Sequence, residues 1–191
     1  MINVKENCST TDNRSDEELV EAALANDAAA FALLYERYYT RTYRIAYGMT
    51  GRREAAEDLT QDVFIKAMRK LGQFNRRSSF STWFYRLSVN CCLNHHRVKG
   101  NRDEELTDDC QPLRASEDEG ILQKEMQAHL HKALLSLKPE SRLVILLKDV
   151  EGLSYEEIAS RMNCPVGTVG TSLSRARKLL AQKLGHLRGK F

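Results

Sequence analysis

The stretch Phe74–Arg97, FNRRSSFSTWFYRLSVNCCLNHHR, decides how the first half of this chain folds. Phe80, Phe84, Leu87 and Cys91 recur at helical spacing, which predicts an amphipathic helix that buries this face. The stretch also carries aromatic rings beside Arg, Asn and Ser. Rings stack on unpaired bases, and these polar groups bind phosphates and base edges. Taken alone, the spacing favours core packing over contact with melted DNA.

Helical spacing continues through the whole first half. Four helices are predicted: one capped by Ser15, a long one capped by Asp27 and ended by Thr50-Gly51, one over about Arg53–Leu71, and one over about Ser79–Val98. In the third helix the positions expected to point inward are Ala56, Leu59, Val63, Ala67 and Met68. No stretch alternates like a strand, so residues 15–99 are predicted to form an all-α unit. Residues 1–14 are expected to be disordered.

The middle of the chain changes in composition. Residues 100–116 hold polar and acidic side chains with few apolar groups, which indicates a flexible acidic linker. A second helical unit is predicted over residues 117–185, followed by a basic tail over 186–191. From Ile158 to Phe191 there is no Asp or Glu, so the end of the chain is basic although the net charge is only +3.

A helix-turn-helix is predicted inside the second unit. Ser154 and Glu157 form a capping box at the start of a short helix, and Arg161–Cys164 is expected to be a tight turn. Pro165 then opens a last helix with an apolar face and a polar, basic outer face, which suits a DNA major groove. The alternative is an ordinary helical hairpin whose basic face is solvated.

Signals for other kinds of chemistry are weak. Cys91 and His95, and Cys92 and His96, are two pairs at i,i+4, but they point about 100° apart on a helix and so do not complete one tetrahedral metal site. No phosphate-binding glycine loop or nucleophile–base motif stands out, so neither a metal, a cofactor nor an enzyme is expected. The N-terminus lacks a signal peptide and no apolar run could span a bilayer, which predicts a cytoplasmic protein with no membrane insertion.

Two separate motif blocks carry a family resemblance. The first is EDLTQDVFIKAMRKLGQF (57–74) followed by SSFSTWFYRLSVN (78–90), and the second is LSYEEIASRMNCPVGTV (153–169) followed by SRARKLL (174–180). In this order the chain resembles the extracytoplasmic-function (ECF) sigma factors, small sigma-70-type initiation subunits of bacterial RNA polymerase. The resemblance implies that residues 15–99 are sigma region 2 and residues 117–185 are sigma region 4.

The resemblance also implies roles for individual residues. Those expected to bind core polymerase are Asp58, Gln61, Asp62 and Phe64. Those expected to recognise the −10 element, with a base flipped into the loop, are Phe74, Asn75, Arg76, Arg77, Ser78, Ser79, Trp83, Asn90 and Asn94. Those expected to recognise the −35 element are Lys148, Pro165, Thr168, Gly170, Thr171, Ser174, Arg175 and Lys178. The family often has basic residues at the places of Gly170 and Ser172, so this chain departs from the pattern there.

The implied partners are core RNA polymerase, through its largest-subunit clamp and its flap, promoter DNA, and an anti-sigma factor. The acidic linker would occupy the path of the nascent RNA, or it would serve only as a tether. Two rival functions stay open: a stand-alone helix-turn-helix regulator of duplex DNA, and an interaction protein that never touches DNA. The regulator hypothesis does not explain the Phe74–Asn94 segment, and the interaction-protein hypothesis gives no role to the basic C-terminal end.

Overall fold

The computed structural model describes residues 13–99 and 121–185. Eight α-helices, two short helical segments and no strand make up these ranges, which confirms the all-α class. The linker and both termini predicted above lie mostly or wholly outside the described residues. The elements are α1 (Asp16–Leu24), α2 (Ala28–Thr50), α3 (Arg53–Lys70), η1 (Leu71–Gln73), α4 (Phe80–Lys99), α5 (Ile121–Leu135), α6 (Pro139–Ile145), η2 (Leu146–Val150), α7 (Tyr155–Met162) and α8 (Val166–Leu184).

The predicted helix ends are confirmed where a local cap fixes them. Ser15 and Glu18 form a capping box on α1, and the Asp27 carboxylate accepts from the first N–H groups of α2. Gly51 ends α2 with φ +74°, a left-handed conformation that glycine adopts without a steric penalty. Ser154 and Glu157 form the second capping box, at the start of α7.

The first unit encloses an aromatic core. Tyr38 of α2 contacts the rings of Phe80 and Phe84 of α4, and Phe84 contacts Phe64 of α3. All four side chains are buried, which confirms the core interpretation of the Phe80–Phe84 spacing. The prediction that Met68 points inward is wrong: its side chain is 56% exposed, and Phe64 takes the place in the core.

The second unit is built around α8. Its apolar face was expected to hold Val166, Val169, Leu173, Ala176 and Leu180. Val169, Leu173 and Ala176 are buried, Leu180 is half-buried, and Val166, at the first position of the helix, is 42% exposed. The predicted turn Arg161–Cys164 is too long, because Arg161 and Met162 still belong to α7. The helix ends at Asn163, whose φ of +52° reverses the chain within a few residues.

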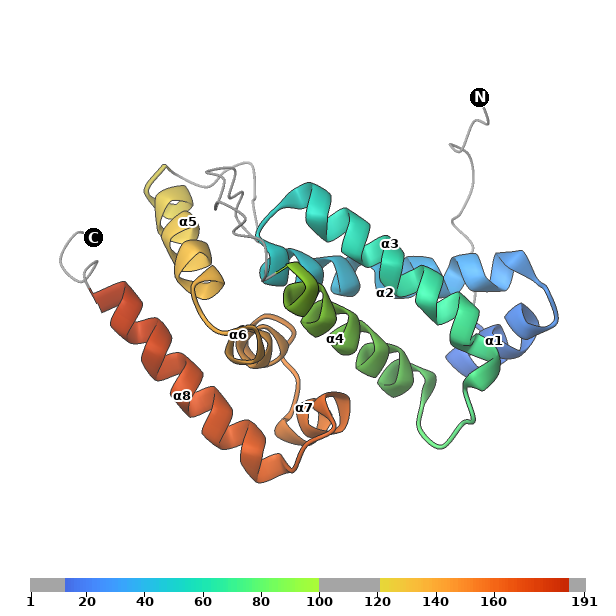
Figure 1. Ribbon diagram of the computed structural model, residues 1–191. Coiled ribbons are helices and arrows are strands. Elements are labelled where there is room, and N and C mark those ends of the chain that lie inside the picture. The colour runs from blue at the N-terminus through green and yellow to red at the C-terminus, as the bar shows by residue number, and fades with distance from the viewer. Residues whose placement is uncertain (1–12, 100–120, 186–191) are drawn as a thin grey trace.

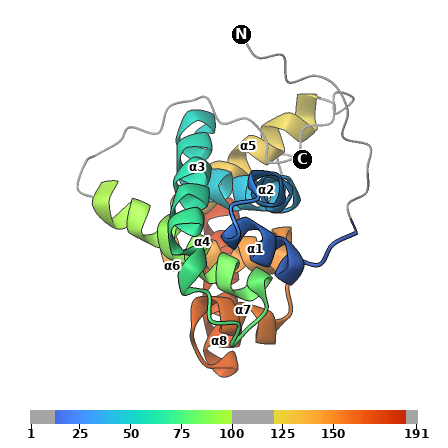
Figure 2. The ribbon, with the colours of Figure 1, turned by 90° about the vertical axis from the view of Figure 1, so that its right-hand side faces the viewer.

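The two units share one apolar core among the described residues. Helix α4 contacts α6 and α7, and α2 contacts α5 and α6, so α5, α6 and α7 pack directly against the first unit, and α8 packs on these three helices (Figure 1). In the perpendicular view, α8 and α7 lie below α1 and α4 (Figure 2). The sequence did not predict this packing of one unit on the other.

Candidate nucleic-acid interface

The loop before α4 is held in an unusual local conformation. Arg76 has φ +57°, which costs an L-residue roughly 1 kcal/mol or more and persists only where neighbouring groups fix it. The side chain of Asn75 accepts from the Arg77 N–H at 3.2 Å, and Ser79 Oγ accepts from the Thr82 N–H at 3.3 Å. The loop is therefore shaped by its own polar side chains and presents them on the surface.

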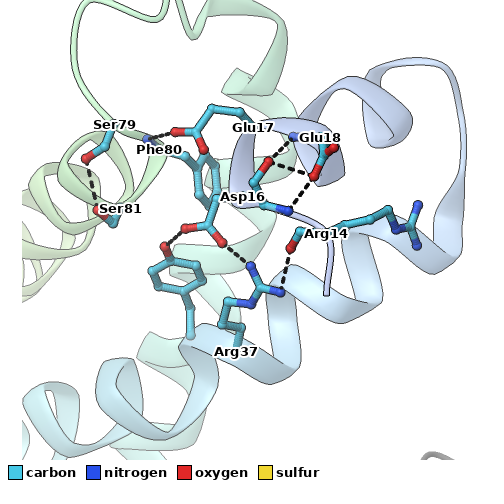
Figure 3. A network of polar contacts seen from close by, with 10 residues as sticks. Arg14, Asp16, Glu17, Glu18, Arg37, Ser79, Phe80 and Ser81 are labelled. Atoms are coloured by element: carbon cyan, nitrogen blue, oxygen red, sulfur yellow. Dashed lines mark hydrogen bonds and ion pairs between the residues drawn. The ribbon is translucent and has the colours of Figure 1, made fainter. Parts of the chain in front are cut away.

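Helix α1 contacts the same loop, and Figure 3 shows one of these contacts, between Glu17 and Phe80. Glu17 accepts from the Phe80 N–H at 3.4 Å, and Glu21 pairs with Arg76 at 2.7 Å. Asp16 accepts from Arg37 and Tyr38, which ties α1 to α2. Sequence analysis missed these carboxylates as supports. The sequence feature that could have predicted them is the spacing of Glu17 and Glu21, which places both carboxylates one turn apart on the same face of α1.

The exposed polar face continues from this loop along α4. Asn75, Arg76, Arg77, Ser79, Asn90 and Asn94 are exposed. Phe74 is not: only 8% of it is exposed, and its ring packs on Phe80 and Trp83 with centroids 5.9 and 5.5 Å away. Trp83 is half-buried. Phe74 thus supports the loop from inside, while the amides and guanidinium groups form its outer surface.

A second surface lies on α3. Asp58, Gln61 and Asp62 are exposed there, and they offer oxygen acceptors to a basic partner. Phe64 does not belong to this surface, because it is 5% exposed and packs on Tyr35 at 4.5 Å. The apolar contribution comes from residues that sequence analysis did not select: Ile65, 43% exposed, and Met68.

The third surface is the outer face of α8. Thr168, Thr171, Ser174, Arg175 and Lys178 are all exposed on it, and Pro165 is exposed just before its first turn. Gly170 is half-buried, and a Cβ there would lie 3.8 Å from the Tyr155 ring, so the position has room for a side chain. The predicted DNA-facing side of this helix is therefore free of the core.

Lys148 lies apart from that face. Its ammonium donates to the Leu153 carbonyl at 2.9 Å and lies 5.3 Å from the centre of the Tyr155 ring. These contacts stabilise the turn before α7. The Lys148 side chain is therefore used in contacts within the second unit, and it does not extend from the outer face of α8.

Comparison with known proteins places this chain in a family. The model for sigma-70 region 2 matches residues 34–102, and that for sigma-70 region 4 matches residues 128–180. The chain is 34% identical to the RNA polymerase sigma-H factor of Pseudomonas aeruginosa over 88% of its length and 93% of the relative's. It is also 34% identical to the ECF RNA polymerase sigma-E factor of Escherichia coli K12, over 89% and 94%. The chain belongs to the ECF sigma factors of the sigma-70 family.

Solved structures show the same fold as this sigma factor. CnrH, determined in complex with the cytosolic domain of CnrY, matches with a TM-score of 0.67 at 23% identity, over 90% of this chain and 97% of CnrH. The sigma factor RpoE, determined in complex with the anti-sigma factor NepR from Bartonella quintana, matches with a TM-score of 0.61 at 25% identity, over 80% and 96%. The resemblance read from the two motif blocks is thus confirmed.

The cysteine and histidine pairs on α4 were the other candidate site. Within 13–99 and 121–185, no three His, Cys, Asp or Glu side chains gather so that they could hold a metal ion. Cys91 and Cys92 are free thiols, and burial raises the pKa of both, that of Cys92 to about 12. Among the helices of those ranges, none is both long and apolar enough to cross a membrane.

Proposed function

We propose that this sigma factor divides its work between its two units. Residues 15–99 bind core RNA polymerase and the melted −10 strand, and residues 117–185 read the −35 element as duplex. The chain itself carries out no covalent chemistry. Because its partner polymerase acts on the bacterial chromosome, we place the protein in the cytoplasm.

One observation carries the assignment of −10 recognition. Asn90 and Asn94 are exposed at i,i+4 on α4, the helix that follows the loop Asn75–Ser79, in which all side chains but half-buried Ser78 are exposed. Amide groups can hydrogen-bond the base edges that become accessible only when the duplex has melted. The loop, with Arg76, Arg77 and Ser78, would hold an extruded base and its phosphates, and Phe74 and Trp83 would support it from below. Capturing that base offsets the few kcal/mol lost in unstacking.

The α3 surface supports binding of core polymerase. Asp58, Gln61 and Asp62 would meet a basic partner surface, with Ile65 and Met68 adding apolar contact in place of Phe64. This mixture of charged groups and exposed apolar side chains is typical of protein interfaces. We assign it to the clamp of the largest polymerase subunit, and we assign the second unit to the flap.

The α8 surface supports binding of the −35 duplex. Thr168, Thr171 and Ser174 offer neutral hydrogen-bonding groups, and Arg175 and Lys178 offer charge toward phosphates. Because Gly170 and Ser172 add no charge, we expect a moderate dependence of duplex binding on salt.

An anti-sigma factor is the third proposed partner. RpoE from Bartonella quintana binds NepR, and it shares the fold of this chain over four-fifths of the sequence. By this similarity we propose that an anti-sigma factor also holds this protein inactive. The acidic linker would either follow the nascent-RNA path or act as a tether.

In vitro transcription with purified core polymerase tests the assignment. Discrete transcripts that core alone does not make are expected on fragments of the source genome. Asn90→Ala should weaken promoter opening, measured with a fluorescent base in the −10 element, by roughly tenfold, the loss of one good base contact. Core binding should stay near normal. Glu36→Ala, exposed on α2 away from the proposed surfaces, is the control. Equal loss of core binding by Asn90→Ala would contradict the division of labour.

A further inference from the structure

Arg76 and Arg77 are neighbours in the loop Asn75–Ser79, but the structure holds them differently. Arg76 has φ +57°, and its guanidinium lies 2.7 Å from the Glu21 carboxylate of α1. Arg77 is exposed, and among the described residues no carboxylate pairs with its guanidinium. One arginine of the loop is therefore already bound to an anion, and the other is available to a ligand.

Helix α1 fixes both ends of this loop. Glu21 binds Arg76 near the start of the loop, and Glu17 accepts from the Phe80 N–H at 3.4 Å where the loop ends (Figure 3). Phe80 is the first residue of α4, so this N–H has no acceptor inside its own helix. Glu17 and Glu21 lie four residues apart on α1, about 6 Å along its axis. Their spacing therefore fixes how far apart the two ends of the loop lie.

Helix α1 is itself held firmly, which makes it a rigid support for the loop. Leu19 and Val20 of α1 are 0% and 1% exposed in the apolar core. The Asp16 carboxylate, next to Glu17, accepts from Arg37 and Tyr38 of α2 (Figure 3). Because close-packed interiors do not deform easily, the two carboxylates that face the loop keep a fixed position relative to α2.

The left-handed conformation of Arg76 depends on such support. A residue other than glycine stays in this conformation only where its surroundings hold it. Glu21 holds the Arg76 side chain, and the Asn75 side chain accepts from the Arg77 N–H at 3.2 Å, which fixes the next peptide. To bind a phosphate, Arg76 would have to exchange one anion for another, whereas Arg77 has no such partner to lose. These contacts assign the shape of the loop to Arg76 and phosphate binding to Arg77.

We propose that Glu21 is a positioning residue for −10 recognition and that it acts through Arg76. Glu17 secures the other end of the loop, and Arg77 is the arginine of the loop that contacts a phosphate of the −10 strand. Helix α1 thereby takes part in −10 recognition without touching DNA. The work of the loop on DNA rests on the proposed function, whereas the support that α1 gives to the loop does not.

Promoter opening by holoenzyme, followed with a fluorescent base in the −10 element, tests the role of Glu21. An exposed ion pair changes an equilibrium by up to about fivefold, so Glu21→Ala and Arg76→Ala should each lower opening roughly threefold to fivefold. The double variant should lose no more than either single one, because both remove the same contact. Exchanging the pair, Glu21→Arg with Arg76→Glu, should restore opening. Glu36→Ala, which removes an exposed carboxylate of α2, should change nothing.

The salt dependence of binding separates the two arginines. Holoenzyme is titrated onto a promoter fragment whose −10 strand is single-stranded, at several salt concentrations. Each phosphate contact on a single strand contributes about 0.7 to the slope of log affinity against log salt. Arg77→Ala should lower the slope by about this amount. Arg76→Ala should lower the affinity but leave the slope unchanged, because it removes a contact within the protein.

Two further measurements guard against variants that merely misfold. Glu17→Gln keeps an oxygen that can accept from the Phe80 N–H and should open the promoter like wild type, whereas Glu17→Ala should lower opening. Amide hydrogen exchange of residues 74–82 in the free full-length chain reports on the loop without DNA. Glu21→Ala should speed this exchange, and the exchanged pair should slow it again.

The outcomes separate this proposal from the proposed function. If the exchanged pair fails to restore opening, or if Arg76→Ala lowers the salt slope as much as Arg77→Ala, then Arg76 itself contacts a phosphate and the proposal is overturned. Unchanged exchange and opening in Glu21→Ala, with normal transcription by wild type, would also overturn it and leave the sigma assignment intact. Faster exchange in Glu21→Ala, in a chain that drives no transcription, would support the role of α1 and count against the proposed function.

Discussion

Removing the guanidinium of Arg142 should destabilise the protein more than any exposed substitution. Arg142 lies in α6 and is 4% exposed. Its nitrogens donate to the carbonyls of Leu134 at 3.0 Å and Leu137 at 3.1 Å, and also to those of Leu135 and Met49. These include the carbonyls that α5 leaves without a partner at its C-terminal end. Burial lowers the pKa of Arg142 to about 10, so it remains charged at neutral pH.

The loss of stability depends on the carbonyl groups that remain after the guanidinium is removed. In Arg142→Met the side chain keeps its length, but the carbonyls cannot be removed with it, and each buried carbonyl without a donor costs about 1–3 kcal/mol. Water will reach some of them, so we expect a loss of about 3–5 kcal/mol, similar to breaking a buried charged contact. Arg142→Lys should recover part of this, because its three donors cannot reproduce the planar fork.

Urea denaturation followed by far-ultraviolet circular dichroism measures the free energy of unfolding of each variant. Arg175→Met is the matched control, because Arg175 is exposed on α8 and should change stability by less than about 0.5 kcal/mol. A loss below about 1 kcal/mol for Arg142→Met would refute the reasoning. It would mean that water satisfies these carbonyls as well as the Arg142 guanidinium does.

Three further predictions concern the second unit. Ser154→Ala removes the acceptor of the Glu157 N–H, 3.1 Å away, and should cost about 1 kcal/mol in thermal melting, with exposed Glu156→Ala as its control. Burial lowers the pKa of His131 from 6.5. The unfolded chain then binds more protons, so stability should fall as pH drops below 6.5, and His131→Phe should flatten that slope in pH-dependent denaturation. Arg175→Ala should reduce the salt slope of −35 duplex binding by about 1, and an unchanged slope would exclude a phosphate contact.

The sequence predicted best what depends on neighbours three or four positions apart. Ser15, Asp27 and Ser154 each cap the helix that follows, and the cap needs only the next few N–H groups. Gly51 ends α2 for an equally local reason. Caps and apolar spacing together were enough for the four helices of the first unit and for the fold class.

Which side chains face the core was harder to predict, as α3 shows. Leu59 and Val63 set the direction of its buried face, and Phe64 and Met68 both lie to one side of that direction. At 100° per residue Met68 lies only about 40° further round the helix than Phe64. Spacing along α3 separates the two residues by only these roughly 40°, and the position of α2 and α4 decides that Phe64 is covered and Met68 is not.

Sequence also does not show which basic side chains near the end of the chain are already paired or buried. In sequence Arg161, Arg177 and Arg175 count equally toward a DNA-binding surface. In the structure Arg161 is buried over Tyr85, and Arg177 pairs with Asp149 from η2. Of the three, only Arg175 is exposed with no acidic partner among the described residues. Two of three cations thus hold the second unit together or hold it to the first. On the proposed function, we expect the electrostatic attraction of α8 for duplex to be smaller than its composition indicates, and specificity to depend more on the neutral side chains of its outer face.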